Sequence, residues 1–305
     1  MKDKKNIKTN TNSSSPSGVR GYSSKRWSQT IAFTIFKLMS YSVVLILIMI
    51  LGFIVSKGFS AISWDFLTKA PEDGMTKGGI YPAIVGTLYL VLGSSLFSFP
   101  IGIMSGIYMN EYASGNKIAA FIRIMTNNLS GVPSVVFGLF GMALFVNAMH
   151  FGDSILAGSL TLGLLSLPLV IRTTEESLKA IDFSYREGSL ALGATKLQTI
   201  RKVIFPMALP NIITGLILSI GRVSGETAPI LFTVAAYFLP KLPSSIFDQV
   251  MALPYHLYVI TTSGTNIEAS RSIAYGTALV LIFIVLLVNI LATLLRNYFS
   301  KKVKI

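Results

Sequence analysis

Six long apolar segments constrain this 305-residue chain more than any other feature. An α-helix rises about 1.5 Å per residue, so about 20 apolar residues cross a bilayer core about 30 Å thick. Because that core offers no water to backbone polar groups, such a segment crosses it as a helix. The sequence therefore predicts an all-α, polytopic membrane protein with six transmembrane helices. We place them near residues 31–56, 81–110, 118–148, 154–172, 207–237 and 273–296.

Composition agrees with a membrane protein and excludes several kinds of site. Hydrophobic residues make up 52% of the chain and the mean hydropathy is +0.64. Charged residues make up 13%, about half the share usual in soluble domains. The absence of cysteine excludes disulfides and thiolate metal sites. The two histidines, His150 and His256, fall far apart in predicted loops, so we expect no metal site.

The first 30 residues differ in character from the rest. They are polar, basic and rich in serine and asparagine, and bury too little apolar surface to fold. We expect residues 1–30 to be a disordered cytoplasmic tail and residues 31–305 to form the transmembrane domain. The tail is not interpreted as a secretory signal, because the apolar segment after it is too long and lacks a cleavage site.

Lysine and arginine distribution predicts the orientation in the membrane. If the N-terminus is cytoplasmic, 19 of the 26 basic residues fall in the tail, the inner loops and the C-terminus, and 5 fall in outer loops. Basic loops favour the cytoplasmic side. Both termini are therefore expected inside, and the net charge of +13 requires no nucleic acid as a partner.

The stretch GRVSGETAP places two charges, Arg222 and Glu226, in the fifth apolar segment. Residues four apart share a helix face, so the two side chains can touch. Arg222 is expected near mid-bilayer, where an arginine generally faces a bundle interior or a wet cavity. Its planar fork suits an oxyanion. The pair is interpreted as part of a substrate pathway, or else as a structural pair, and Pro229 is expected to kink the helix.

Arg172 is the second pathway candidate. It lies at the inner end of the fourth segment, where it either contacts substrate at the cytoplasmic mouth or anchors the helix at the membrane surface. Glu111, at the end of the second segment, is interpreted as interfacial or structural.

The longest inner connection, residues 173–206, predicts two short amphipathic helices. Gly193 permits a tight bend between them. From the residues alone, this loop either lies on the membrane surface or docks into a groove on a partner.

Within that loop, REGSLALGATKLQTIRKVIFPMALP resembles the EAA loop of ABC importer permeases with the MetI-like architecture. Glu187 and Gly193 match in type and spacing, Gly188 replaces an alanine, and Pro206 closes the motif. The resemblance implies that Glu187, Gly188 and Gly193 couple the chain to an ATPase subunit. The chain has no G-x-x-x-x-G-K-[ST] pattern, so ATP and magnesium are expected on that partner. No cofactor is expected on this chain, which is predicted not to be an enzyme.

Five further stretches, found in one order from about residue 80 to the C-terminus, resemble the PstA family, the A-type permeases of phosphate-specific ABC importers. They are GIYMNEYA, LSGVPSVVFGLFG, SGETAPILFT, ALPYHLYV and EASRSIAYGTALVL. The resemblance implies inward phosphate transport by alternating access in a bacterial cytoplasmic membrane. The implied partners are an ATPase in two copies, a second, PstC-like permease and an extracytoplasmic phosphate-binding protein.

Alternatives remain at this point. The cargo could be another oxyanion, such as phosphonate, sulfate or molybdate, and the chain could be the C-type permease. A different class is an ATP-independent transporter or channel, which would leave the EAA-like loop without a role. The outer segment 240–270 is apolar enough to form a re-entrant helix.

Overall fold

The computed structural model describes residues 20–113, 115–263 and 267–303. These residues fall into two compact units, divided between Phe53 and Ile54. The described part of the first unit lies in helix α1 (Arg20–Gly58). No glycine or proline interrupts the sequence between Tyr22 and Leu51, so the helix runs on without a break. The expectation of a disordered tail is wrong for residues 20–30, which are helical. Residues 1–19 of that tail lie outside the described residues.

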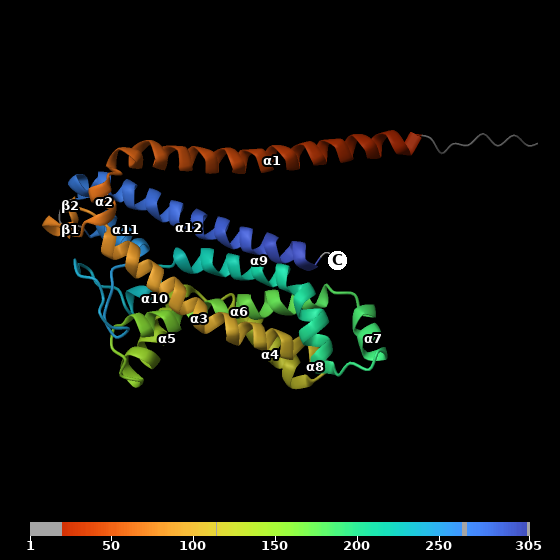
Figure 1. Cartoon of the computed structure of the whole chain (residues 1–305). Helices are drawn as coiled ribbons and strands as arrows, with labels where there is room; N and C mark the ends of the chain where they lie inside the picture. Colours follow the sequence, from red (N-terminus) through yellow and green to blue (C-terminus); the bar gives the residue numbers. More distant parts are fainter. Residues whose placement is uncertain (1–19, 114, 264–266, 304–305) are drawn as a thin grey trace, which may run out of the picture. The chain divides into compact units, whose positions relative to one another are not determined.

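Four long helices dominate the second unit: α3 (Tyr81–Glu111), α6 (Ile155–Lys179), α9 (Phe205–Ser224) and α12 (Ile267–Val303) (Figure 1). α6 packs against α3 and α9, and α12 packs against α9. In the described residues, five helices are long and apolar enough to span a membrane, or six if one bent pair counts as a span. The predicted all-α, polytopic fold is confirmed.

The bent pair occupies the third apolar segment. α4 (Lys117–Leu129) is followed by α5 (Ser134–Gly141) and the π-helical turn η3 (Met142–Ala148), and the two parts differ in direction by 105°. Pro133 lacks an N–H and disfavours helical geometry in the residue before it, which explains why the helix breaks here. The expected single span 118–148 is therefore a broken one.

The fifth apolar segment is also not one helix. α9 ends at Ser224, and the N–H of Gly225 bonds back to the carbonyl oxygen of Arg222. Pro229 then stands at the start of a new short helix, α10 (Ala228–Leu231). The expected helix 207–237 with a kink at Pro229 is wrong beyond Ser224.

The connection between α6 and α9 contains α7 (Ser184–Ala191), α8 (Lys196–Thr199) and the π-helical turn η4 (Ile200–Ile204). α6 continues to Lys179, so the connection is shorter than the predicted loop 173–206. Thr195 and Gln198 form a capping box that starts α8. We call this end of the second unit the α7 end.

The opposite end, called here the hairpin end, consists of short elements and the buried helix α11. A two-stranded antiparallel sheet pairs Pro71 with Gly78 and Glu72 with Lys77. His256 lies buried within α11, so its expected position in a loop is wrong. The elements are η1 (Phe59–Ala61), α2 (Trp64–Thr68), β1 (Pro71–Glu72), η2 (Asp73–Met75), β2 (Lys77–Gly78) and α11 (Leu253–Thr262).

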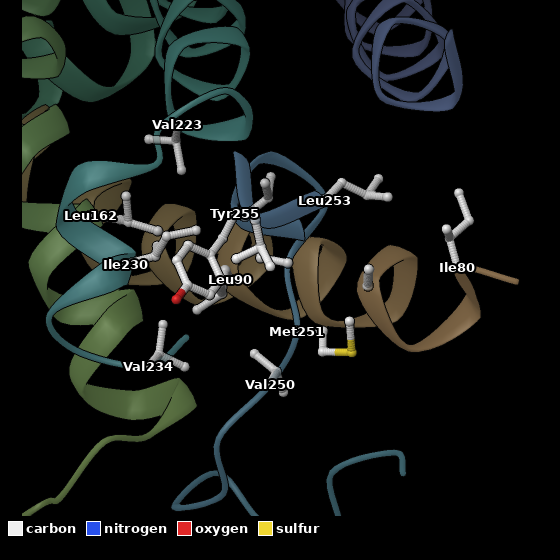
Figure 2. Close-up of a cluster of buried hydrophobic side chains, with 14 of the residues drawn as sticks. Ile80, Leu90, Leu162, Val223, Ile230, Val234, Val250, Met251, Leu253 and Tyr255 are labelled. Carbon is white, nitrogen blue, oxygen red and sulfur yellow. The ribbon is translucent and has the colours of Figure 1, made fainter. Parts of the chain in front are cut away.

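A buried apolar cluster joins these elements to the long helices. Figure 2 shows Leu90 of α3, Leu162 of α6, Val223 of α9 and Tyr255 of α11 in this cluster. Because Val223 belongs to the cluster, the end of α9 is fixed to α3 and α6. This packing sets the position of the neighbouring charges.

Candidate functional site

Arg222 and Glu226 form an ion pair at the end of α9. The Arg222 Nε donates to the Glu226 Oε1 over 3.4 Å, and the side chains are 39% and 16% exposed. The predicted contact is confirmed, although Glu226 lies beyond the last helical residue. Contact between the two side chains survives the end of the helix because the chain turns back there, with the Glu226 N–H bonded to the Val223 carbonyl oxygen.

The surroundings of Glu226 are mostly apolar. Glu226 shares the lining of a small space with Leu90, Leu162 and Ile230. On the α12 side, a side chain added at Gly221 would begin 3.7 Å from the Asn289 amide nitrogen. The Asn289 Oδ1 is buried and has no hydrogen-bond partner among the described residues. Polar groups thus gather near the end of α9, with Glu226 facing apolar residues and Arg222 partly exposed.

The Arg222 guanidinium has most of its donors available. Among the described residues it makes one hydrogen bond, to Glu226. Arg123, by contrast, bonds both the Glu175 carboxylate, at 2.7 Å, and the Met109 carbonyl oxygen, at 2.8 Å. Since a guanidinium carries five N–H donors, Arg222 can engage an oxyanion while it keeps Glu226.

Arg172 lies elsewhere. Its Nε bonds Glu176 Oε1 at 2.8 Å, and both side chains are exposed. It lines a hollow of about 200 Å³ at the α7 end together with Arg123 and Glu175. Ten residues of α6, about 15 Å of helix, separate Arg172 from Leu162 beside Glu226. The structure does not bring the two predicted arginines together.

The three predicted coupling residues lie in the exposed α7 region. Glu187 and Gly188 are exposed in α7, and Gly193 has a φ of +81°, the left-handed geometry that glycine adopts without strain. Exposed leucines flank them, with Leu192 91% exposed. An apolar surface of this kind on a polar loop suits contact with another protein.

Sequence reasoning missed a second ion pair, between Arg186 of α7 and Glu111 at the end of α3. The Arg186 Nη2 lies 2.7 Å from the Glu111 Oε1. Arg186 stands next to a predicted coupling residue, but a partner 75 positions away leaves no local sequence signal. The pair lines a cavity of about 830 Å³ at the α7 end.

Among the described residues, no group of three or more histidine, aspartate or glutamate side chains is arranged to hold a metal ion.

Comparisons with known proteins identify relatives over most of the chain. Residues 98–305 match the family described as binding-protein-dependent transport system inner membrane component. A probable ABC transporter permease protein, YqgI of Bacillus subtilis, is 34% identical and covers 89% of this chain and 96% of its own length. A phosphate transport system permease protein, PstA of Mycobacterium leprae, is 36% identical, with coverage of 91% and 92%.

Solved structures share the fold at low identity. A bacterial ABC transporter involved in import of the acidic polysaccharide alginate aligns with a TM-score of 0.63 at 15% identity, covering 92% of this chain and all of its own. The MetNI methionine ABC transporter aligns with a TM-score of 0.57 at 17% identity, covering 72% and 97%. The predicted permease architecture is therefore confirmed, and the chain belongs to the family of binding-protein-dependent transport system inner membrane components.

Proposed function

We propose that the chain is the transmembrane permease subunit of an ATP-driven importer of inorganic phosphate. The observation that carries this proposal is similarity, over 80–91% of the chain, to permeases named for phosphate transport. Those of Mycobacterium leprae and Xylella fastidiosa are 36% identical, and that of Haemophilus influenzae is 33% identical. Family membership implies a binding protein and an ATPase as partners in general terms.

Arg222 is the residue proposed to contact phosphate. It combines a permanent charge, several available N–H donors and a partly exposed side chain paired with Glu226, which lies among apolar residues. When a phosphate passes the end of α9, the N–H donors of Arg222 replace some of the water molecules bound to it. This replacement lowers the free-energy cost of removing the phosphate from water. Glu226 holds the guanidinium between passages.

Two features favour brief contact over tight binding. A phosphate bound to Arg222 lies beside the Glu226 carboxylate, and the two anions repel each other. The α9 C-terminus also presents carbonyl oxygens, and the negative end of a helix dipole disfavours an anion. Capture at low concentration is accordingly assigned to a separate extracytoplasmic phosphate-binding protein.

The α7 end is proposed to face the cytoplasm, as are both termini. Support comes from the basic residues of this end, which outnumber those of the hairpin end. The α7 region would then dock onto an ATPase, present in two copies, through Glu187, Gly188 and Gly193. ATP and magnesium bind that ATPase. A second, PstC-like permease completes the pathway, and alternating access carries phosphate inward.

Reconstitution of the complex in proteoliposomes tests the pathway. Arg222→Gln is expected to lower ATP-driven phosphate uptake by about 10- to 100-fold, the effect of a lost charge-assisted hydrogen bond. Arg222→Lys should retain part of the uptake because it keeps the charge but loses the fork. Arg271→Gln, which removes an exposed charge at the hairpin end, is the matched control and should transport normally. Normal uptake by Arg222→Gln would refute the pathway role.

Three further measurements separate the alternatives. Competition by phosphonate, sulfate and molybdate against labelled phosphate identifies the oxyanion. Transport by this chain in liposomes without an ATPase would indicate an ATP-independent carrier or channel. Glu226→Gln should alter leak or coupling more than the choice of substrate, because it frees Arg222 without removing it. Unchanged leak and coupling would assign Glu226 to the fold alone.

A further inference from the structure

A nearly buried ion pair joins the coupling region to the end of α3. The Arg186 Nη2 lies 2.7 Å from the Glu111 Oε1, and the Arg186 Nε lies 3.3 Å from the same oxygen. The two side chains are 13% and 8% exposed. They are much less accessible than the Arg172–Glu176 pair at the same end, whose members are both 59% exposed.

Arg186 also bonds the C-terminal end of α6. Its Nη2 donates to the Leu178 carbonyl oxygen at 3.0 Å, and its Nη1 donates to the Ile181 carbonyl oxygen at 3.1 Å. Carbonyl groups at a helix C-terminus lack partners within the helix, so an arginine fork is a suitable donor for them. One side chain therefore connects α7 with both α3 and α6.

Further polar contacts hold α8 to the same place. The Lys196 ammonium donates to the Glu111 backbone oxygen, and it lies 4.6 Å from the centroid of the Tyr112 ring. The hydroxyls of Ser189 in α7 and Thr199 in α8 lie 2.9 Å apart. Both short helices are thus anchored at the end of α3.

Apolar packing does not explain the position of α7. Within α7, whose residues are all described, no side chain is buried. A helix that buries no side chain has little packing to fix its position, so its orientation depends on the polar contacts that it makes. Arg186 supplies the contacts that reach α3 and the end of α6.

We propose that Arg186 is a positioning residue for energy coupling, which fixes α7 to the ends of α3 and α6. Displacement of α7 then moves the inner ends of two bundle helices with it. This inference rests on the proposed function, in which α7 receives the movement of an ATPase. A planar guanidinium that makes several hydrogen bonds fixes both the position and the orientation of α7, whereas a single hydrogen bond would let the helix turn about it.

The first experiment measures phosphate transported per ATP hydrolysed by the reconstituted complex. Arg186→Gln is expected to lower this ratio by about tenfold or more, because α7 loses its charge-assisted bonds to Glu111 and to the carbonyl oxygens of Leu178 and Ile181. Arg186→Lys should recover part of it. Arg201→Gln removes an exposed charge in η4 and is the matched control, expected to leave the ratio unchanged.

A double variant separates positioning from fold stability. Arg186→Gln with Glu111→Gln leaves no unpaired buried charge, so this complex should assemble as the unmodified one does. A positioning role predicts that it still transports with a lowered ratio. A ratio equal to that of the unmodified complex would overturn the proposal and reduce the pair to a stabilising contact.

The second experiment does not depend on the substrate. The chain has no cysteine, so spin labels can be placed at Ser184→Cys in α7 and Tyr108→Cys in α3, both exposed positions. The distance distribution between them should be narrow in the unmodified permease and broader with Arg186→Gln. Equal widths would refute the positioning role. If the unmodified complex fails to import phosphate, the proposed function fails, while this measurement still decides the role of Arg186.

Discussion

His256 is buried, and no described residue forms a hydrogen bond with its imidazole ring. It is 1% exposed, and neither ring nitrogen has a hydrogen-bond partner among the described residues. Burial lowers the pKa of His256 from 6.5 to about 4, since a charged imidazolium is poorly solvated there. His256 is therefore neutral at physiological pH.

This burial predicts acid sensitivity. The unfolded chain binds a proton near pH 6.5 and the folded chain only near pH 4, so folded-state stability falls as the pH drops through that window. The slope is at most about 1.4 kcal/mol per pH unit for one proton. Above pH 7 the contribution is constant. Thermal unfolding of the detergent-solubilised protein from pH 4 to 8 measures it.

Two histidine variants assign the effect. His256→Leu should remove this part of the pH dependence, because a similar apolar side chain has no proton to bind. His150→Asn should keep it, since His150 is exposed and asparagine tolerates the left-handed geometry of that residue. Identical pH profiles for the unmodified protein and His256→Leu would contradict the prediction.

Among the charged residues, only short-range pairing could be predicted from the sequence. Arg222 and Glu226 are four positions apart, so a local rule brings them together. Glu111 and Arg186 are 75 positions apart, and their meeting depends on the tertiary arrangement of α3, α6 and α7. A single sequence gives the charge of each residue but not this arrangement.

At the scale of elements, the α3–α6 contact depends on glycine. A side chain at Gly102 would begin 2.6 Å from Val170, and one at Gly106 would begin 2.6 Å from Thr174 and 2.9 Å from the Ile171 carbonyl oxygen. Small residues of this kind let membrane helices approach closely and gain van der Waals contact.

Gly106→Leu is therefore expected to destabilise the protein by about 1–3 kcal/mol, as overpacking of a filled interior does. The Ile171 backbone cannot move aside without disturbing α6. A lower midpoint of thermal unfolding in detergent is the expected result. Met104→Leu, at a 71% exposed position of the same helix, should leave the midpoint nearly unchanged. A midpoint for Gly106→Leu equal to that of this control would disprove the close contact.

The end of α9 shows what hydropathy misses. The apolar run continues to residue 237, whereas the helix stops at Ser224. Hydropathy reports only the solvent preference of side chains, and a loop buried inside the protein shares that preference with a membrane-spanning helix. The local signals were present, since glycine follows many helix ends and proline often begins a helix. Gly225 and Pro229 occupy those positions.

For the whole molecule, the number of apolar segments could be predicted from the sequence, but the points at which their helices break or bend could not. Segment length and composition are local properties, and they predicted the membrane class and all six apolar stretches. The 105° bend between α4 and α5 depends on packing as well as on Pro133, because proline is tolerated inside α3 at Pro100. A single sequence does not show whether a helix ends at a proline or continues through it.

The orientation of the whole molecule is tested with single cysteines on the natural cysteine-free background. Leu190→Cys, at the α7 end, should react with a membrane-impermeant maleimide only from the cytoplasmic side. Ile246→Cys, near the hairpin end, should react only from the outside. Both side chains are exposed, 48% and 57%, so accessibility is set by the membrane. Reaction of Leu190→Cys from the outside in intact cells would reverse the orientation.

The π-helical turn η4 fixes how many residues must connect α8 to α9. Lys196–Ser224 forms one continuous helix, and its π-helical turn at residues 200–204 holds one residue more than an α-helical turn would. Each residue of an α-helix advances the phase by about 100°. Deleting one residue there would rotate Lys196 away from the Glu111 backbone oxygen and Thr199 away from Ser189, although both side chains would still be present. The number of residues in η4 therefore sets the rotation of α8 relative to α9. A one-residue deletion in η4 would change this rotation, whereas a substitution would not.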